Sequence, residues 1–233
     1  MSASSATTQP KRPSHGPSAS QRPPARLPDA SSRERIHAAA LSLFARYGYE
    51  GVSLQMIADA VGLHKSTLFH HYASKLALVD EVLDDAVGRV LGHVAPLETE
   101  AQPRLETLLG AVDELVDRFS NEPEAARLLV SAMASPDDSE LRQAGSAGHT
   151  LRLYGILASW LDRARRSGAI RAVSIRQAIP NLIGLVLFYP AVASDLRDLV
   201  GPEPFSARAR DVRKRELRQI LVGMLAPASV VSR

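Results

Sequence analysis

The sequence predicts an all-α protein in which a helix-turn-helix unit of three short helices precedes a larger helical bundle. Hydrophobic residues make up 45% of the 233 residues but aromatic residues only 5%, so the core must consist mainly of Ala, Leu and Val. That mixture favours helices over sheets. Beyond residue 31, apolar residues recur at the spacing of amphipathic helices. Capping residues and glycines separate these segments and mark the expected helix ends.

The first helix is predicted to begin after Ser31. Ser31 and Glu34 have the spacing of a capping box, in which each side chain accepts a backbone amide of the other residue. The residues behind them recur on one face of a helix; they are Ile36, Ala39, Ala40, Leu43, Phe44 and Tyr47. Gly48 and Gly51 then supply the stop, because glycine accepts the left-handed conformation at a helix end.

Two further helices are predicted around a tight turn at Gly62. Ser53 caps the first of them, whose inward side chains are Ile57, Ala58 and Val61. The next helix runs over about residues 65–72, with Leu68 and Tyr72 facing inward. Small side chains near the turn let two helices meet at a steep angle. The three helices, residues 31–75, are expected to share one core.

The outward face of residues 65–72 carries no acidic side chain. None occurs between Asp59 and Asp80, and two of the four lysines of the chain, Lys65 and Lys75, flank this helix. The face presents Lys65, Ser66, Thr67, Phe69, His70 and His71. Ammonium groups can read guanine in the DNA major groove, and hydroxyls can hold phosphates. Lys65 is the expected base-reading residue, against the plainer alternative of a solvated helix face.

No metal, cofactor or catalytic centre is expected. His70 and His71 are adjacent and His64 is distant from them, so the histidines lack the i, i+4 spacing of a helical metal site. The chain contains no cysteine, and no phosphate loop or Ser-His-Asp pattern is present. An enzyme is therefore not expected.

These residues resemble the tetracycline-repressor (TetR) family of bacterial transcriptional regulators. The residues that carry the resemblance are Phe44, Gly48, Ser53, Ile57, Ala58, Gly62, Thr67, Leu68, Phe69, His71, Tyr72, Ser74, Lys75 and Leu78. It implies that Ser53 and Lys75 hold phosphates. It also implies that Gln55, Lys65 and Thr67 approach base edges, and that Phe69, His70 and His71 contact the DNA backbone or thymine methyl groups.

The chain departs from the family pattern at three positions. The family usually has Tyr at 69 and Phe at 72, and a capping Ser is frequent at 64, whereas this chain has Phe69, Tyr72 and His64. Because Phe69 has no hydroxyl, we do not predict here the phosphate contact that the resemblance implies for a tyrosine at position 69.

Residues 76–227 are predicted to form a helical ligand-binding and dimerisation domain. Apolar stripes lie within residues 76–86, 105–119, 125–133 and 153–161. Residues 178–193 are apolar nearly all round, as expected of a helix buried on several sides. The last helix has one apolar face, expected to pack, and a basic face, expected to meet water. The apolar face consists of Val212, Leu217, Ile220, Leu221, Met224 and Leu225. By the resemblance, the last two helices form the homodimer interface.

A ligand site is predicted from polar and aromatic residues among these apolar stripes. Such polar points orient small molecules in apolar pockets, although core residues with satisfied hydrogen bonds are equally common. The candidates are Phe119, His149, Leu153, Tyr154, Trp160, Asn181 and Phe188.

The sequence also predicts the location of the protein. The lack of cysteine suits a reducing compartment, and no secretory signal follows Met1. The longest apolar run, residues 182–193, has Pro180 before it and Pro190 near its end and is shorter than the ~18 residues of a membrane span. We therefore expect a cytoplasmic protein without a membrane partner.

Residues 1–30 are predicted to be a disordered basic tail. The first 28 residues contain four basic and no acidic residues, which leaves 24 basic against 25 acidic residues elsewhere. Six prolines and six serines occur there, and such a segment cannot bury enough to fold. A solvated extension and an arm along the DNA groove both remain open.

The expected function is that of a homodimeric regulator that binds double-stranded operator DNA. It is expected to act as a repressor released from its operator by a small molecule. The alternative is a helical sensor or interaction protein without specific DNA binding.

Overall fold

The computed structural model describes residues 31–144 and 148–227, and every regular element within these ranges is a helix, which confirms the all-α prediction. The predicted basic tail, residues 1–30, lies outside the described residues. The helices are α1 (Ser32–Tyr47), α2 (Leu54–Val61), α3 (Lys65–His71), α4 (Lys75–Thr99), α5 (Leu105–Asn121), α6 (Pro123–Ala134), α7 (Glu140–Gln143), α8 (His149–Ser167), α9 (Ile175–Val192), α10 (Arg197–Val200) and α11 (Ala207–Leu225).

The predicted helix ends of α1 and α2 are confirmed. The Ser31 hydroxyl accepts the Glu34 amide at 3.3 Å, and the Glu34 carboxylate accepts the Ser31 amide at 2.6 Å, which completes the capping box. The Ser53 hydroxyl accepts the Met56 amide at 3.2 Å. Gly62 ends α2 at φ +68°, in the left-handed region that favours glycine.

The first three helices share one core, as predicted. Ile36, Phe44, Ile57, Ala58 and Leu68 are at most 1% exposed, and Tyr72 is 3% exposed. Tyr47, predicted to lie on the buried stripe, is 45% exposed. It is the last residue of α1, where no following element covers it.

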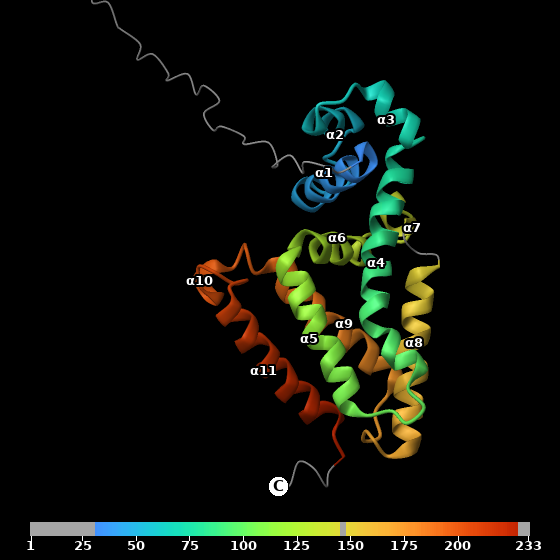
Figure 1. Cartoon of the computed structure of the whole chain (residues 1–233), viewed down its shortest axis with the longest axis vertical. Coiled ribbons are helices and arrows are strands. Elements are labelled where there is room, and N and C mark those ends of the chain that lie inside the picture. Colours follow the sequence, from blue (N-terminus) through green and yellow to red (C-terminus); the bar gives the residue numbers. More distant parts are fainter. Residues whose placement is uncertain (1–30, 145–147, 228–233) are drawn as a thin grey trace, which may run out of the picture.

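Helix α4 runs from this unit into the rest of the molecule and packs against α1, α5, α6 and α8 (Figure 1). The Ser74 hydroxyl caps it by accepting the Ala77 amide at 3.0 Å. Its buried stripe consists of Leu78, Val79, Val82, Leu83, Ala86, Val87, Val90, Leu91, Val94 and Leu97. Successive members are one or three residues apart, which gives the i, i+3, i+4 pattern of one continuous helix face. One helix thus supplies core to both parts of the fold.

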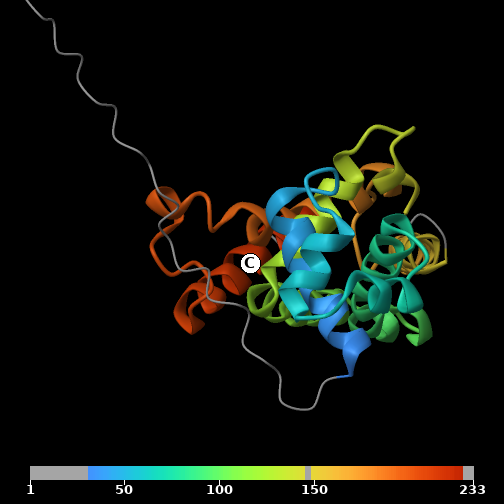
Figure 2. The ribbon, with the colours of Figure 1, turned by 90° about the horizontal axis from the view of Figure 1, so that it is seen from above.

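The C-terminal helices surround the lower part of α4, and α10 and α11 stand at one side of the molecule in both views (Figures 1 and 2). Leu217, Leu221 and Leu225 of α11 are buried, as predicted. Val212 and Ile220, predicted on the same packed face, are 41% and 46% exposed. At about 100° per residue, Val212 lies about 140° around the helix from Leu217, and Ile220 lies about 100° from Leu221, so both fall outside the buried stripe of Leu217, Leu221 and Leu225.

The basic face of α11 was predicted to be solvated, but two of its cations form ion pairs with another helix. The Lys214 ammonium lies 2.6 Å from Asp117, and the Arg218 guanidinium lies 2.8 Å from Asp113 and 3.1 Å from Glu106. These partners belong to α5, so ion pairs hold α11 along that helix. The prediction failed because the acidic partners are about a hundred residues away in the sequence.

Helix α9 is longer than the apolar run predicted from the sequence. Pro180 and Pro190 both lie inside the helix, and neither ends it. By length and composition alone, this 18-residue helix of mean hydropathy 1.3 is long and apolar enough to cross a membrane, and it is the one such helix in the described ranges. The same test is passed by core helices of soluble proteins.

The Glu100 carboxylate joins the end of α4 to α5 and α8. It accepts the Thr107 hydroxyl at 2.7 Å, the Arg104 Nε at 3.0 Å and the Trp160 Nε1 at 3.1 Å. Burial by itself raises the pKa of this carboxyl. The hydrogen bonds outweigh burial and hold the pKa at about 2, so the folded protein favours the ionised form.

We expect Glu100→Gln to lower the free energy of unfolding by about 1–3 kcal/mol at neutral pH. The folded pKa lies below the ordinary 4.5, so this stabilisation is present above about pH 5 and is lost as the pH falls toward 2. Urea denaturation at pH 7 and at about pH 3 should therefore show a smaller difference between the two proteins in acid. Glu98→Gln, at a carboxylate that is 44% exposed, is the matched control. A pH-independent difference would contradict the role of ionisation.

Candidate nucleic-acid interface and ligand cavity

The predicted DNA-contacting residues lie on and beside α3, which occupies one end of the molecule with α2 (Figure 1). The exposed ones are Ser53, Gln55, Lys65, Ser66, Phe69, His70 and His71, and Thr67 is half-buried. The Lys65 Nζ lies 5.6 Å from the centre of the Phe69 ring, so the cation and the aromatic side chain share one patch. The Gln55 amide donates to the Asp59 carboxylate at 2.7 Å.

The start of α3 carries no side-chain cap. His64 occupies the N-cap position, and its side chain makes no capping hydrogen bond. This agrees with the departure noted in the sequence, where a capping Ser is frequent at that position.

Lys75 has a partner inside the protein that the sequence did not indicate. Its Nζ donates to the Tyr49 carbonyl at 2.9 Å and lies 4.0 Å from the centre of the Tyr49 ring. An ammonium group has three donors, so a phosphate contact remains compatible with this arrangement. Lys75 therefore also holds the segment after α1 against the start of α4.

Phe69 and Tyr72, the two aromatic residues that are exchanged relative to the family pattern, have different environments. Phe69 is 46% exposed on the outer face of α3, whereas Tyr72 is 3% exposed. The Tyr72 hydroxyl donates to the Glu81 carboxylate at 2.9 Å, and the Arg33 guanidinium donates to the same carboxylate at 3.1 and 2.6 Å. The hydroxyl at position 72 thus ties the end of α3 to α1 and α4.

This cluster shifts the pKa of two of its members. The hydrogen bond from Arg33 lowers the pKa of Glu81. Burial raises the pKa of Tyr72, and the neighbouring carboxylate raises it further. Both shifts favour the states that form the cluster, an ionised Glu81 and a neutral Tyr72.

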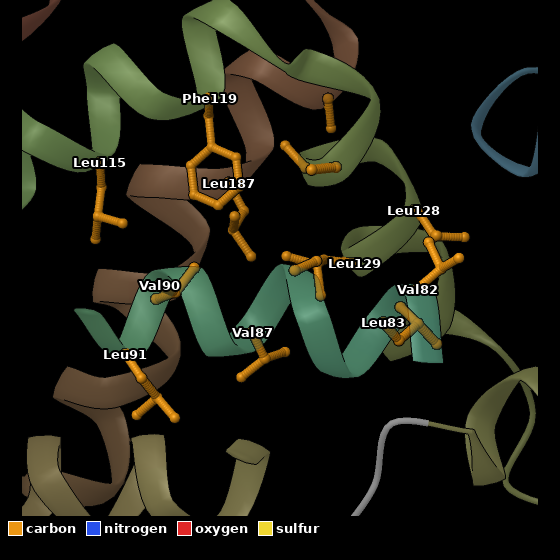
Figure 3. Close-up of a cluster of buried hydrophobic side chains, with 14 of the residues drawn as sticks. Val82, Leu83, Val87, Val90, Leu91, Leu115, Phe119, Leu128, Leu129 and Leu187 are labelled. Atoms are coloured by element: carbon orange, nitrogen blue, oxygen red, sulfur yellow. The ribbon is translucent and has the colours of Figure 1, made fainter. Parts of the chain in front are cut away.

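A cavity of about 320 Å³ lies among α4, α5, α6, α8 and α9. Figure 3 shows part of its wall, with Phe119 of α5 and Leu187 of α9 facing α4. The wall is almost entirely aliphatic. Its polar side chains are Thr150 and Tyr154, and Arg142 of α7 is the one charged side chain that lines it among the described residues. An apolar cavity of this size with few polar groups is typical of small-molecule sites.

The structure brings three of the seven predicted ligand residues into this wall, namely Phe119, Leu153 and Tyr154. The other four lie elsewhere. His149 pairs with Asp84 at 2.6 Å, and Trp160 is fully buried beside Glu100. Asn181 is exposed, because the apolar helix that it interrupts turns that side to solvent. Phe188 is 59% exposed and lines a separate groove with Tyr189 and Leu196.

Sequence reasoning missed the contribution of α4, α6 and α7 to the cavity. The sequence indicated only an apolar stripe in residues 76–86, and a stripe that lines a cavity has the same pattern as one that packs in a core. Arg142 gave no signal, because α7 spans only four residues and shows no periodicity. Within residues 31–144 and 148–227, no group of three His, Cys, Asp or Glu side chains gathers as a metal site would require.

We expect Tyr72→Phe to lower the free energy of unfolding by about 0.5–1.5 kcal/mol, since one hydrogen bond to Glu81 is lost and the ring is kept. Urea denaturation measures the loss, and faster hydrogen exchange at the end of α3 should accompany it. Tyr47→Phe is the control, because Tyr47 is exposed. Equal stability of the two variants would rule out a structural role for the Tyr72 hydroxyl.

Comparisons with known proteins agree with this geometry. Residues 36–82, which cover α1 to the first part of α4, match the profile described as "Bacterial regulatory proteins, tetR family". The chain is 33% identical over 81 residues to the transcriptional repressor KstR2 of Mycolicibacterium smegmatis, an alignment that covers 35% of this chain and 40% of KstR2. It is 29% identical over 181 residues to the transcriptional activator FasR of the same organism, covering 69% of this chain and 83% of FasR.

The fold has solved counterparts over most of its length. The structure of AibR in complex with isovaleryl coenzyme A and operator DNA superposes with a TM-score of 0.64 at 19% identity. The superposition covers 84% of this chain and 98% of AibR. Residues 36–82 are thus similar to the tetR family of bacterial regulatory proteins, and most of the chain shares the fold of AibR.

Proposed function

We propose that this protein is a ligand-responsive transcriptional regulator that binds operator DNA as a homodimer and leaves it when a small molecule occupies the cavity. The observation that carries the proposal is helix α4. It begins directly after α3, which bears the exposed cationic face, and its other end lines the apolar cavity. A change in the cavity therefore acts on the helix that positions the DNA-contacting surface. The expected coupling is ~1–3 kcal/mol.

The family names support this role. KstR2 is named a repressor and FasR an activator, and AibR carries both a ligand and operator DNA. We propose repression with release by the ligand for this chain, and a cytoplasmic location. The proposed domains are residues 31–75 for DNA binding and 76–227 for ligand binding and dimerisation.

DNA recognition is assigned to the exposed face of α3 and the residues flanking it. Lys65 and Thr67, with Gln55 of α2, are the proposed base readers. Ser53, Ser66 and Lys75 are proposed to hold phosphates, and Phe69, His70 and His71 to contact the DNA backbone or thymine methyl groups. A compact ammonium at the start of a helix reaches guanine O6 and N7 in the major groove.

Dimerisation is assigned to the outer faces of α9 and α11. Phe188, Leu196, Val212 and Ile220 are between 41% and 59% exposed, and such apolar faces mark interaction surfaces. A second copy would cover them, which also accounts for the exposed side of the apolar helix α9 without a membrane. A twofold dimer would set two copies of α3 in successive major grooves, ~34–36 Å apart.

We expect Lys65→Ala to weaken binding to the preferred DNA by ~1–3 kcal/mol and to relax the preference at one base pair. Lys75→Ala should weaken binding to all sequences alike and reduce the salt dependence, because a phosphate contact is lost. Fluorescence anisotropy on a sequence selected from a random pool, and on scrambled DNA, measures both effects. Equal losses on both DNAs for Lys65→Ala would defeat its base-reading role. Absence of binding to any DNA at low salt would favour a sensor without DNA binding.

The double variant Phe188→Glu/Ile220→Glu should be a monomer of 25.1 kDa, because two carboxylates on each copy would be buried without partners at the interface. Sedimentation velocity measures the mass. Met56→Glu, at a residue 37% exposed on α2, leaves the proposed interface intact and is the matched control. A dimeric double variant would place the interface elsewhere.

A further inference from the structure

The short helix α7 lies between the cavity and the helix-turn-helix unit. Arg142 and, just past its end, Ala144 line the cavity wall, while Glu140 at its start faces the other way. The Tyr49 hydroxyl donates to the Glu140 carboxylate at 2.5 Å. Four residues thus contact both functional parts of the molecule, and α7 packs against α4 and α6 between them (Figure 1).

Arg142 is a charged side chain in the wall of a largely apolar cavity, and its side chain is 42% exposed. Its Nη1 donates to the Met133 carbonyl at 2.9 Å, which fixes the guanidinium beside the end of α6. Its acidic neighbour is Asp137, 3.5 Å away with a side chain 97% exposed. An ion pair of that kind contributes little. The guanidinium has five donors, so several remain for an anion that enters the cavity.

The residues that line the cavity indicate the chemistry of a complementary ligand. Aliphatic side chains of α4, α5, α8 and α9 line the cavity and match the apolar body of a ligand. Among the described residues, Arg142 is the one charged side chain in this wall. Leu151, which also lines the cavity, is 67% exposed, so the cavity reaches the surface beside it. The complementary molecule has a long apolar body and one anionic end, because a guanidinium binds carboxylate and phosphate groups in bidentate fashion.

The contact of α7 with the helix-turn-helix unit continues to the start of α4. Tyr49 is 4% exposed, and its carbonyl and ring hold the Lys75 ammonium. Burial raises the pKa of the Tyr49 hydroxyl, as does its bond to Glu140, so this group stays a neutral donor. A shift of Glu140 therefore acts on Tyr49, and through it on Lys75 beside α3.

We propose that Arg142 binds the anionic group of an otherwise apolar ligand, and that α7 transmits its occupancy to the helix-turn-helix unit through the Glu140–Tyr49 hydrogen bond. The proposal rests on the proposed function and specifies its ligand class and its coupling. A ligand anion that draws the guanidinium toward the cavity displaces Glu140, two residues away on the same four-residue helix. Helix α7, which lies between the cavity and the helix-turn-helix unit, then changes its position.

The ligand class is tested by calorimetry on the full chain, with saturated fatty acids from octanoate to hexadecanoate and with the alcohols of the same lengths. Arg142→Gln should weaken binding of the best acid by roughly ten- to a hundredfold, as expected for loss of a charged hydrogen bond, and leave the matching alcohol unchanged. Arg152→Gln is the control, because Arg152 is exposed on α8 and pairs with Glu98.

The acyl-coenzyme A esters of the same acids form a second arm. If the ester rather than the acid binds and loses affinity in Arg142→Gln, a phosphate is the anionic group and the proposal holds. Equal affinities of acid, ester and alcohol for the native protein would overturn it. So would an unchanged affinity in the variant, or binding of none of the probes.

The coupling is tested by hydrogen exchange with the best-binding probe. In the native chain, the ligand should change exchange around Tyr49 and in α3. In Tyr49→Phe the ligand should bind with the same affinity, while the change in α3 is lost. Glu140→Gln keeps an acceptor and should retain part of it, which separates coupling from misfolding. An unaltered response in Tyr49→Phe would overturn the route. Neither measurement uses DNA, so the proposal can fail while operator binding stands, and the reverse.

Discussion

Burial of one apolar stripe along α4 is the constraint on which the rest of the structure depends. Leu78, Val79 and Val82 close the core of the first three helices, and Val87, Val90 and Val94 form a wall of the cavity. A helix of 25 residues is ~37 Å long and spans both parts of the fold. Under the proposed function, a ligand that repacks its lower half would also act on its upper half. The shared helix α4 and the contact of α7 with Tyr49 would then couple the two sites together.

Several contacts cross between the two parts besides the shared helix α4. Helix α1 packs directly against α6, whose Leu129 and Met133 line the cavity. Polar contacts add to this packing, because Arg33 of α1 and Tyr72 donate to the Glu81 carboxylate of α4, and Tyr49 donates to Glu140 of α7. The hydrogen bonds of the two buried tyrosines each contribute about 0.5–3 kcal/mol, which is comparable with the coupling energy of a typical allosteric protein. Under the proposed function, a ligand that alters these contacts would shift the population of two arrangements.

The exchanged aromatic residues show how a departure from the family pattern is absorbed. A hydroxyl at position 69 would point outward, where Phe69 instead places its ring beside Lys65. The hydroxyl of Tyr72 instead lies in the interior, where it and the Arg33 guanidinium both donate hydrogen bonds to the Glu81 carboxylate. This hydroxyl fastens α3 to the body of the protein. The exposed face of α3, which we propose contacts DNA, consequently offers cations and short hydroxyls.

Local sequence determined the helix-turn-helix unit almost completely. Ser31, Ser53, Gly48 and Gly62 act on backbone groups within four residues, and the buried positions of α1 to α3 follow the helical period. The cavity depended on tertiary structure, because an aliphatic residue has the same pattern whether it meets another side chain or a void. The partners of Lys75, Lys214 and Arg142 lie between nine and about a hundred residues away in the sequence. Periodicity and capping are properties of neighbouring residues, whereas ion pairs, cavities and the contact of α7 with Tyr49 exist only once distant segments have packed together.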